Sequence, residues 1–278
     1  MKRSMGWFTT GRDIEAVNLL KTVFNGIEDG RIEGRISFIF MNREPGEGQF
    51  SDRIMDLAGK WGIPLITFSS ARFKPELWKK RHDSPEIIAE WRHQYHHEAL
   101  ERLRDMQSDF SVLAGYMLIV SPEMCQKLNL INLHPAPPNG PSGTWQEVIW
   151  QLIASKASES GVMIHMVTPE LDQGPPITYC LYGIRGTHFS GYWDEMDEKL
   201  RKTTLHEIRL REGENNTLFR MIRSEGVKRE IPLLFETIRW LSSGRILLKG
   251  NMIYLDDREQ PKGICLNDQV ESLIAASA

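Results

Sequence analysis

Apolar runs and helical periodicities alternate along the first two-thirds of the chain. Short apolar runs bounded by turn residues predict buried strands, and the segments between them carry apolar residues at helical spacing. The predicted strands cover residues 6–10, 35–41, 64–68, 110–114, 130–134, 162–167 and 177–182. The predicted helices run from residue 14 onward, over 51–60, over 85–106, from 121 onward and over 144–154. Because strands and helices alternate, we expect an α/β fold whose mostly parallel sheet is covered by helices on both faces.

Short polar residues mark the predicted helix starts. Ser84 and Ser121 each precede a proline, and we expect each of them to cap the helix that this proline opens. Near the N-terminus, Thr10 and Asp13 have the spacing of a capping box.

The character of the chain changes from about residue 194. The segment that follows is charged and helical, and no linker rich in Pro, Gly or Ser precedes it. We therefore expect a core over residues 1–193 and an extension over residues 194–278 that packs on this core.

The extension has its own predicted elements. Residues 231–241 predict an amphipathic helix, and Gly244 marks its end. Residues 245–254 predict a hairpin that turns at Lys249-Gly250-Asn251.

Composition bounds the class of protein. The 278 residues have 41% apolar content, enough to bury a full core, and their net charge of -3 gives no electrostatic case for a nucleic-acid or membrane partner. The three cysteines form no CxxC pair, so neither a disulfide framework nor a zinc site is predicted. No apolar segment resembles a signal peptide or a membrane span, and we expect a cytoplasmic protein.

Three polar side chains follow two of the predicted strands. Asn132 and His134 lie two positions apart, so they point to the same face of their strand. Asp172 follows the strand over 162–167, in a loop made tight by Gly174 and two prolines. An amide can donate to a developing oxyanion, an imidazole can stabilise it or carry a proton, and a carboxylate can orient and charge the imidazole. Together they suggest an acyl-transfer site, although singly each residue fits a turn or a strand end.

The full pattern resembles the folate-dependent formyltransferase family. Five matching pieces occur in the family's order: Val112-Leu-Ala-Gly-Tyr-Met117, Ser121-Pro-Glu123, Ile131-Asn-Leu-His-Pro135, Gly161-Val-Met-Ile-His165 and Leu171-Asp-Gln-Gly174. The resemblance covers roughly residues 5–190, and the combination of Asn-x-His-Pro with Leu-Asp-x-Gly is specific where either half alone is weak.

The resemblance implies a Rossmann-like formyltransferase fold and a reaction. A formyl group would pass from 10-formyltetrahydrofolate, the donor co-substrate, to a primary amine, with glycinamide ribonucleotide of purine biosynthesis as the expected acceptor. Asn132, His134 and Asp172 would be catalytic, and no metal would be required. The pterin ring of the folate would lie against Met117, Leu118, Ile119 and Val120, and Lys74 would contact its glutamate tail.

Two stretches depart from the family. At the first strand-to-helix turn, which would bind the acceptor's phosphate, this chain has Gly11, Arg12 and Asp13 where the purine-pathway members have Gly-Ser-Asn. Arg12 could strengthen a phosphate contact, whereas Asp13 would repel phosphate unless it caps the helix; the alternative is an ordinary turn with an exposed arginine. Farther along, Val227 stands where those members have a substrate-binding acidic residue, with Glu225 and Glu230 close but displaced.

Histidines elsewhere allow a second interpretation. His93, His96 and His97 lie at helical spacing that can bring two imidazoles to one face, as in zinc sites. The charged residues around them favour a solvated helix face instead. His165, in an apolar strand, is expected to be a hydrogen-bonded core or near-site residue.

Other functions remain open at this point. Formyltetrahydrofolate deformylase would use the same residues with water as the acceptor, and another transferase could formylate a sugar-nucleotide amine or methionyl-tRNA. The absence of a basic groove in the sequence disfavours tRNA. A folate-binding module without activity would not need the intact triad. The partners expected are small molecules, and the sequence leaves a homodimer open.

Overall fold

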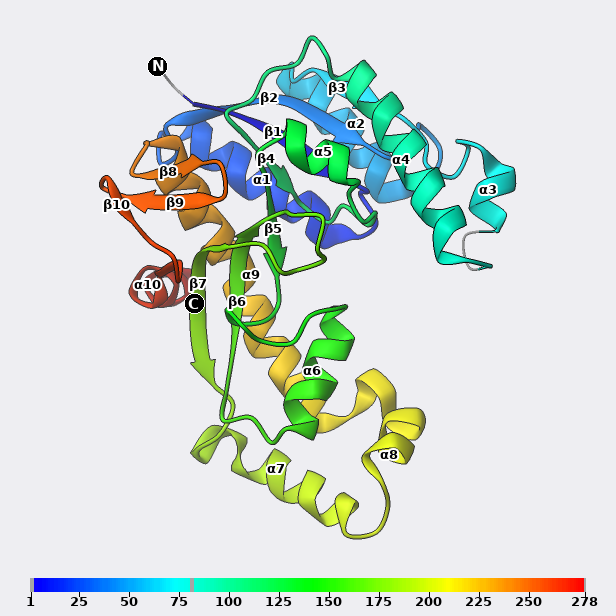
Figure 1. The fold of residues 1–278 in the computed structure, drawn as a ribbon. Helices are drawn as coiled ribbons and strands as arrows, with labels where there is room; N and C mark the ends of the chain where they lie inside the picture. Colours follow the sequence, from blue (N-terminus) through cyan, green and yellow to red (C-terminus); the bar gives the residue numbers. More distant parts are fainter. Residues whose placement is uncertain (1–2, 81–82, 278) are drawn as a thin grey trace. The chain divides into compact units, whose positions relative to one another are not determined.

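Two sheets organise the computed structural model, which describes residues 3–80 and 83–277 (Figure 1). Within these residues, eight strands form a mostly parallel sheet in the order β11-β7-β6-β5-β4-β1-β2-β3, and three form a small antiparallel sheet in the order β10-β9-β8. The strands are β1 (Arg3–Thr9), β2 (Gly34–Met41), β3 (Leu65–Thr67), β4 (Phe110–Leu113), β5 (Leu130–His134), β6 (Glu159–Met166), β7 (Pro176–Gly183), β8 (Ile246–Lys249), β9 (Met252–Leu255), β10 (Arg258–Glu259) and β11 (Ile264–Cys265). The predicted α/β fold with a mostly parallel sheet is confirmed.

The helices fill the predicted gaps between the strands and dominate the C-terminal part. They are α1 (Ile14–Glu28), α2 (Gln49–Trp61), α3 (Pro75–Lys79), α4 (Pro85–Arg102), α5 (Pro122–Lys127), α6 (Trp145–Ala154), α7 (Thr187–Leu200), α8 (Leu205–Glu212), the 3-10 helix η1 (Gly213–Asn215), α9 (Thr217–Ser242) and α10 (Asn267–Ser277). No helix in the described ranges combines the length and apolar character that crossing a bilayer requires.

The chain forms two compact units. The first unit comprises the described residues of Met1–Asn132, Met166–Gly174 and Ile238–Glu259; the second comprises those of Leu133–His165, Pro175–Thr237 and Gln260–Ala278. Each unit takes segments from both sides of residue 193. This division therefore differs from the predicted core over residues 1–193 and extension over residues 194–278, and that domain assignment stays a prediction.

The first unit is a parallel sheet with helices on both faces. Strand β1 pairs with β2 and β4, and β2 continues to β3. Helices α4 and α5 lie on one face and α1 and α2 on the other (Figure 1). Alternation along the strands sends Phe8, Phe38 and Phe40 into one aromatic cluster with Trp91 and Tyr95 of α4, so buried rings fix α4 on the sheet.

The predicted serine caps of the first unit are confirmed. The Ser84 hydroxyl accepts a hydrogen bond from the Ile87 amide at 3.3 Å, and the Ser121 hydroxyl accepts one from the Met124 amide at 3.3 Å. Both helices therefore begin at the proline that follows the cap.

The capping box predicted for Thr10 and Asp13 is wrong. The residue that caps α1 is Asp13, whose side chain accepts from the Ala16 amide. Thr10 cannot serve as the cap because its hydroxyl accepts from the Met117 amide at 2.8 Å. This contact ties the end of β1 to the segment after β4.

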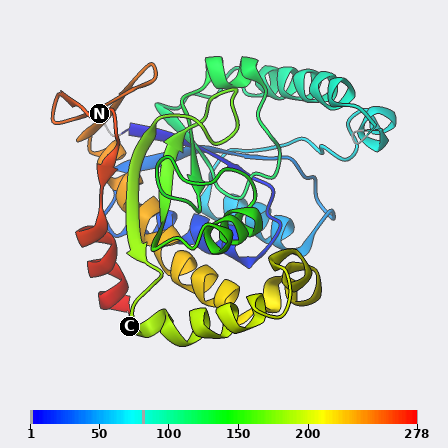
Figure 2. The same cartoon turned by 60° about the horizontal axis from the view of Figure 1, so that its bottom comes forward.

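The second unit packs helices around an antiparallel strand pair. Val162 of β6 pairs with Cys180 of β7, and the short β11 pairs in parallel with β7. Helices α6, α7, α8 and α9 share one apolar cluster, which includes Trp150 and Phe219, and α6, α7 and α9 lie side by side in Figure 2. Beyond β11, the Asn267 amide accepts from the Leu181 N–H at 2.9 Å and donates to its carbonyl at 2.8 Å.

Helix α9 is continuous where two separate helical segments are predicted. The chain is helical without interruption over α9, 26 residues with Pro232 inside, whereas the sequence predicted a charged helical segment from about residue 194 and a separate helix over 231–241. Proline removes one backbone hydrogen bond. Buried side chains on both sides of it, such as Ile222 and Leu233, pack well enough for the helix to continue.

The predicted hairpin is confirmed. Lys249 pairs with Met252, so Gly250 and Asn251 form the two-residue turn between β8 and β9.

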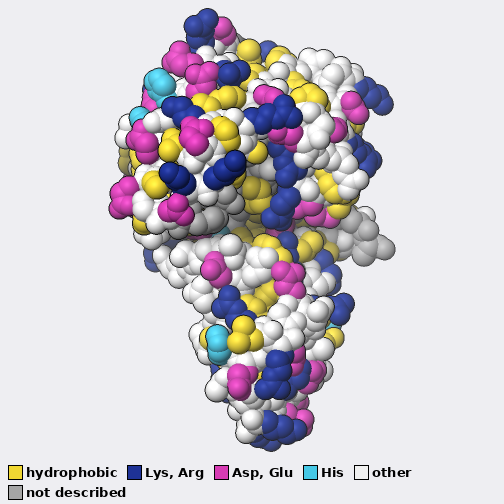
Figure 3. All heavy atoms as spheres, turned by 90° about the vertical axis from the view of Figure 1, so that its right-hand side faces the viewer, with side chains coloured by type: hydrophobic (Ala, Val, Ile, Leu, Met, Phe, Trp, Pro, Cys, Tyr) yellow, Lys and Arg dark blue, Asp and Glu magenta, His cyan; other side chains and the backbone are white. Residues whose placement is uncertain are grey.

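On the face of the molecule shown in Figure 3, cationic and anionic side chains are interspersed rather than gathered by sign.

A buried histidine holds the segment that follows β4. His96 of α4 is fully buried; its Nδ1 accepts from the Ser121 amide at 3.1 Å, and its Nε2 lies 3.2 Å from the Tyr116 hydroxyl. Since Nδ1 accepts, the neutral ring carries its proton on Nε2 and donates it to the hydroxyl. Burial, with the nearby Arg92 charge, lowers the pKa of His96 to about 3.

This shift predicts an acid-sensitive stability. Between pH about 6.5 and about 3 the unfolded chain binds a proton at His96 that the folded chain excludes, so the unfolding free energy should fall as pH falls, by up to about 1.4 kcal/mol per pH unit. Urea unfolding at several pH values should show a shallower pH slope for His96→Gln. The exposed His206 provides the control, because His206→Gln should keep the wild-type slope. An unchanged slope in His96→Gln would contradict the assignment.

Candidate active site

Strand β5 carries two of the predicted catalytic residues at its carboxyl end. Asn132 and His134 lie on the same side of the strand, and His134 is 3% exposed. The His134 Nε2 lies 2.9 Å from the Pro141 carbonyl oxygen. A carbonyl only accepts, so Nε2 carries a proton, and this contact fixes both the rotation and the tautomer of the neutral ring.

The loop that supplies this carbonyl is anchored at both ends. Within residues 135–143, the Gly140 amide donates to the Pro137 carbonyl at 2.9 Å, and the Gln151 side chain donates to the Ser142 carbonyl at 3.3 Å. The loop then enters α6 through a capping box between Thr144 and Glu147. Hydrogen bonds therefore hold this loop, which is also rich in proline and glycine.

A second buried histidine contacts the first. The rings of His134 and His165 meet edge to face, with centroids 6.1 Å apart and planes at 88°. His165 is 2% exposed on β6, which confirms the prediction of a buried histidine close to the candidate site.

The loop of Asp172 begins beside the strand that carries Asn132. The amide of Val167 donates to the Leu130 carbonyl of β5 at 2.8 Å. Asp172 itself has φ +56°, a left-handed conformation that Asp and Asn tolerate better than most residues. Asn132 and Asp172 belong to the first unit and His134 to the second.

Gly174 closes this loop against its own starting strand. A Cβ added at Gly174 would lie 1.7 Å from the Met166 carbonyl oxygen, so only glycine fits. The close approach fixes the length of the loop and therefore the place at which Asp172 stands.

The turn predicted to bind phosphate has a glycine that cannot be replaced. Gly11 has φ +59°, and a Cβ there would lie 2.7 Å from Cα of Ser51. The Gly11 amide donates to the Thr9 hydroxyl at 3.1 Å, and its carbonyl accepts from Arg43 at 3.3 Å. Arg43, which the sequence gave no reason to select, is thus a second guanidinium at this turn.

Arg12 and Asp13 neutralise each other at the same turn. Nε and Nη2 of Arg12 both lie 3.2 Å from Oδ2 of Asp13, while Oδ1 of Asp13 caps α1 through Ala16. Asp13 therefore caps the helix, as the sequence required if this carboxylate is not to repel the phosphate of a substrate. Both side chains are about half exposed, so solvent weakens the pair and Arg12 can exchange partners.

The predicted pterin segment is a loop after β4 with apolar side chains turned to solvent. Met117 is 50% exposed and Ile119 is 43% exposed, whereas Val120 is buried and Leu118 is partly buried. Exposed apolar side chains of this size are available to a flat ligand. Lys74 is exposed, donates to the Gln94 side chain and lies 5.4 Å from the Phe73 ring centroid.

The histidine cluster on α4 divides between core and surface. His96 is buried, whereas His93 and His97 are exposed and approach the Glu123 carboxylate at 4.0 and 3.3 Å. Across residues 3–80 and 83–277, no group of three or more His, Cys, Asp and Glu side chains is arranged to hold a metal ion.

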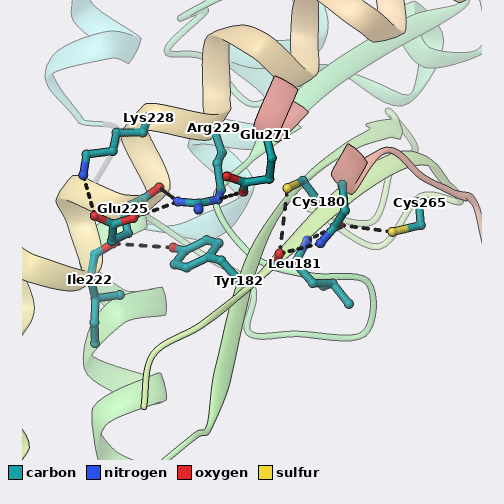
Figure 4. A network of polar contacts seen from close by, with 10 residues as sticks. Cys180, Leu181, Tyr182, Ile222, Glu225, Lys228, Arg229, Cys265 and Glu271 are labelled. Carbon is teal, nitrogen blue, oxygen red and sulfur yellow. Dashed lines mark hydrogen bonds and ion pairs between the residues drawn. The ribbon is translucent and has the colours of Figure 1, made fainter. Parts of the chain in front are cut away.

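The acidic residues near Val227 are engaged in ion pairs of the second unit (Figure 4). Glu225 pairs with Lys228 and, at 2.9 Å, with Arg229, which also lies over the Tyr182 ring. Burial opposes ionisation of Glu225, but the hydrogen bonds from Lys228 and Arg229 outweigh it and hold its pKa below the usual value. Glu225 therefore already has cationic partners.

Comparisons with known proteins decide the family. The profile described as "Formyl transferase" matches residues 20–184, more than half of the chain. The chain belongs to the formyl transferase family. It is therefore a formyl-transferring enzyme, and Asn132, His134 and Asp172 fall inside the matched range.

Relatives and solved structures agree with this family. Phosphoribosylglycinamide formyltransferase of Schizosaccharomyces pombe is 29% identical over 60% of this chain and 75% of its own length, and that of Haemophilus influenzae is 24% identical over 90% and 93%. The fold resembles phosphoribosylglycinamide formyltransferase of Coxiella burnetii with a TM-score of 0.63 (17% identity, 95% of this chain and 99% of that one). It also resembles formyltetrahydrofolate deformylase of Burkholderia mallei with a TM-score of 0.56 (18% identity, 92% and 70%).

The close approach of Gly174 yields a second prediction. Gly174→Ala should destabilise the folded state by about 1–3 kcal/mol and displace Asp172, because the added methyl group has no space. Chemical unfolding and turnover measured on the same sample check both effects. Gly59→Ala in α2, where a Cβ meets nothing within 4 Å, is the matched control and should be neutral or slightly stabilising. Equal behaviour of the two variants would contradict the prediction.

Proposed function

We propose that this enzyme transfers the formyl group of 10-formyltetrahydrofolate to the amine of glycinamide ribonucleotide in purine biosynthesis. The observation that carries the proposal is the match to relatives named phosphoribosylglycinamide formyltransferase, over as much as 90% of this chain. In this proposal the enzyme acts on small-molecule substrates in the cytoplasm, and the reaction requires no metal, nucleic acid or membrane. A homodimer is compatible with it.

In this proposal Asn132 and His134 stabilise the oxyanion of the tetrahedral intermediate. The Asn132 amide donates one hydrogen bond, and the protonated His134 ring supplies a positive charge. The Pro141 carbonyl that accepts from His134 Nε2 supports this role, because it holds the ring in one orientation. Each oxyanion donor should contribute about 2.7–4 kcal/mol to transition-state stabilisation.

We assign to Asp172 the role of electrostatic partner of the His134 imidazole. Its carboxylate favours the imidazolium form of His134 and assists, directly or through water, the movement of the amine proton to the leaving nitrogen. The left-handed backbone and the tight loop ending at Gly174 support this assignment, since they give the carboxylate a fixed starting point.

The substrates are assigned to two segments of the first unit. The exposed Met117 and Ile119, with Leu118 and Val120, would contact the pterin ring, and Lys74 would attract the carboxylates of the folate tail. At the α1 turn, backbone amides of residues 11–13 would meet the acceptor's phosphate, with Arg12 leaving Asp13 to bind it.

A hydrolase is the second candidate. The likeness to formyltetrahydrofolate deformylase of Burkholderia mallei over 92% of this chain favours considering it. The two outcomes separate in one experiment: 10-formyltetrahydrofolate is incubated with and without glycinamide ribonucleotide and a sugar-nucleotide amine, and products are separated. Formylated glycinamide ribonucleotide supports the proposal, formate released at full rate without an amine indicates the hydrolase, and a formylated sugar nucleotide indicates that acceptor class.

The catalytic assignment predicts losses in turnover. His134→Ala and Asp172→Asn should each lower kcat at least about 100-fold while folate still binds, because both groups act mainly in the transition state. Asn keeps the left-handed backbone of residue 172, so Asp172→Asn removes only the charge. His188→Ala and Asp257→Asn, the latter also left-handed at φ +63°, are the controls. Near wild-type turnover in either catalytic variant would refute the assignment.

The phosphate assignment predicts a change in KM for one substrate. Arg12→Ala should raise the KM for glycinamide ribonucleotide several-fold and leave the KM for 10-formyltetrahydrofolate nearly unchanged. Arg104, which also pairs with the next residue, Asp105, is the matched control, and Arg104→Ala should change neither. If Arg12→Ala is silent, or if an acceptor without phosphate reacts equally well, the acceptor is not glycinamide ribonucleotide, although formyl transfer stands.

A further inference from the structure

A cavity of about 600 Å³ opens to solvent at the surface of the second unit, and the formyl-transfer reaction gives it no role. It is bordered by α6, α7, η1 and the first half of α9, and its lining residues are Trp145, Tyr192, Glu214, Thr217, Phe219, Arg220, Met221, Arg223 and Ser224. All of these except Trp145 lie beyond residues 20–184, which match the family profile. The volume is in the range of small-molecule sites, roughly 300–1,000 Å³.

One part of the wall is aromatic. Trp145 is the first residue of α6, and its ring lies 5.7 Å, centroid to centroid, from the buried ring of Phe219. Tyr192 and Met221, both partly buried, extend the apolar surface. An apolar group of several carbon atoms would lose its hydration against this wall.

Three charged side chains, two cationic and one anionic, complete the lining. Arg223 is already engaged, since it pairs with Glu230 and stacks over Trp145 at 4.6 Å. Arg220 has no side-chain hydrogen bond or ion pair within the described chain, and Glu214 has no cationic partner there, accepting only from the Gln146 side chain at 3.1 Å. One guanidinium and one carboxylate are thus left to face a ligand.

We propose that this cavity binds a small zwitterion with an apolar side chain, that is, a free α-amino acid. Its carboxylate pairs with Arg220, its ammonium group with Glu214, and its side chain rests on Trp145. A purely anionic ligand such as a nucleotide would satisfy Arg220 but be repelled by Glu214. The combination of both charges with an aromatic wall therefore favours the zwitterion. None of its lining residues is assigned to formyl transfer.

Calorimetric titration of the full-length protein tests the proposal. The probes are L-phenylalanine and L-leucine, their N-acetyl forms without the ammonium group, their amides without the carboxylate, and adenosine monophosphate. Saturable binding of at least one free amino acid is expected, with both derivatives about 10-fold weaker or worse. No binding of any apolar amino acid at millimolar concentration, or preferred binding of adenosine monophosphate or a derivative, would overturn the proposal.

Paired substitutions test which group binds which charge. Arg220→Ala should weaken the free amino acid about 10-fold but leave the affinity for its amide unchanged, since the amide has no carboxylate to lose. Glu214→Gln should likewise weaken the free amino acid about 10-fold but leave the affinity for its N-acetyl form unchanged, since the N-acetyl form has no ammonium group to lose. Both residues are exposed, so the variants should fold, and the exposed Arg201 provides the control through Arg201→Ala. Additive effects of substitution and derivative would refute the assigned contacts.

Discussion

The hydrogen bond from His134 Nε2 to the Pro141 carbonyl is the contact on which the candidate site depends. It joins the end of β5 to a loop that leads directly into α6, and it selects one tautomer of a buried imidazole. Such a bond contributes only about 1 kcal/mol when the ring is neutral and more when it is charged. It can hold the ring only because the loop is already fixed by its prolines, its internal hydrogen bonds and the Thr144 capping box.

The two departures from the family share a physical feature. At the α1 turn, Asp13 is compensated by Arg12, and near Val227, Glu225 is compensated by Lys228 and Arg229. In each case an acidic side chain is neutralised within its own unit. At the α1 turn, the phosphate of the proposed acceptor must therefore replace Asp13 as the partner of Arg12.

Much of the fold could be predicted because local signals decide it. The serine caps, the Lys249–Met252 hairpin and the buried strands follow from short-range hydrogen bonding and from hydrophobic period. The continuity of α9 through Pro232 could not be predicted, because packing of Ile222 and Leu233 on either side of Pro232 outweighs a local helix breaker. Nor could the cap of α1, since the Thr10 hydroxyl is taken by Met117, more than a hundred residues away.

The candidate site was predictable to a similar degree. Asn132, His134 and Asp172 are visible as side chains in a motif, and the structure locates them at a strand end and in a glycine-closed loop. The partner of His134 was not visible, because a backbone carbonyl can belong to any residue type. Arg43 was missed for a related reason, since it reaches the α1 turn from the bend that follows β2.

Asn267 has a consequence for solubility. Strand β11 covers only two residues of β7, and the Asn267 side chain then takes the place of a further strand residue by binding both the N–H and the C=O of Leu181. Exposed strand edges are templates for pairing with another chain. The Asn267 side chain thus occupies the backbone groups at the outer edge of β7 where the neighbouring strand ends. Because Asn267 is also the first residue of α10, the start of this helix protects the strand edge from pairing with another chain.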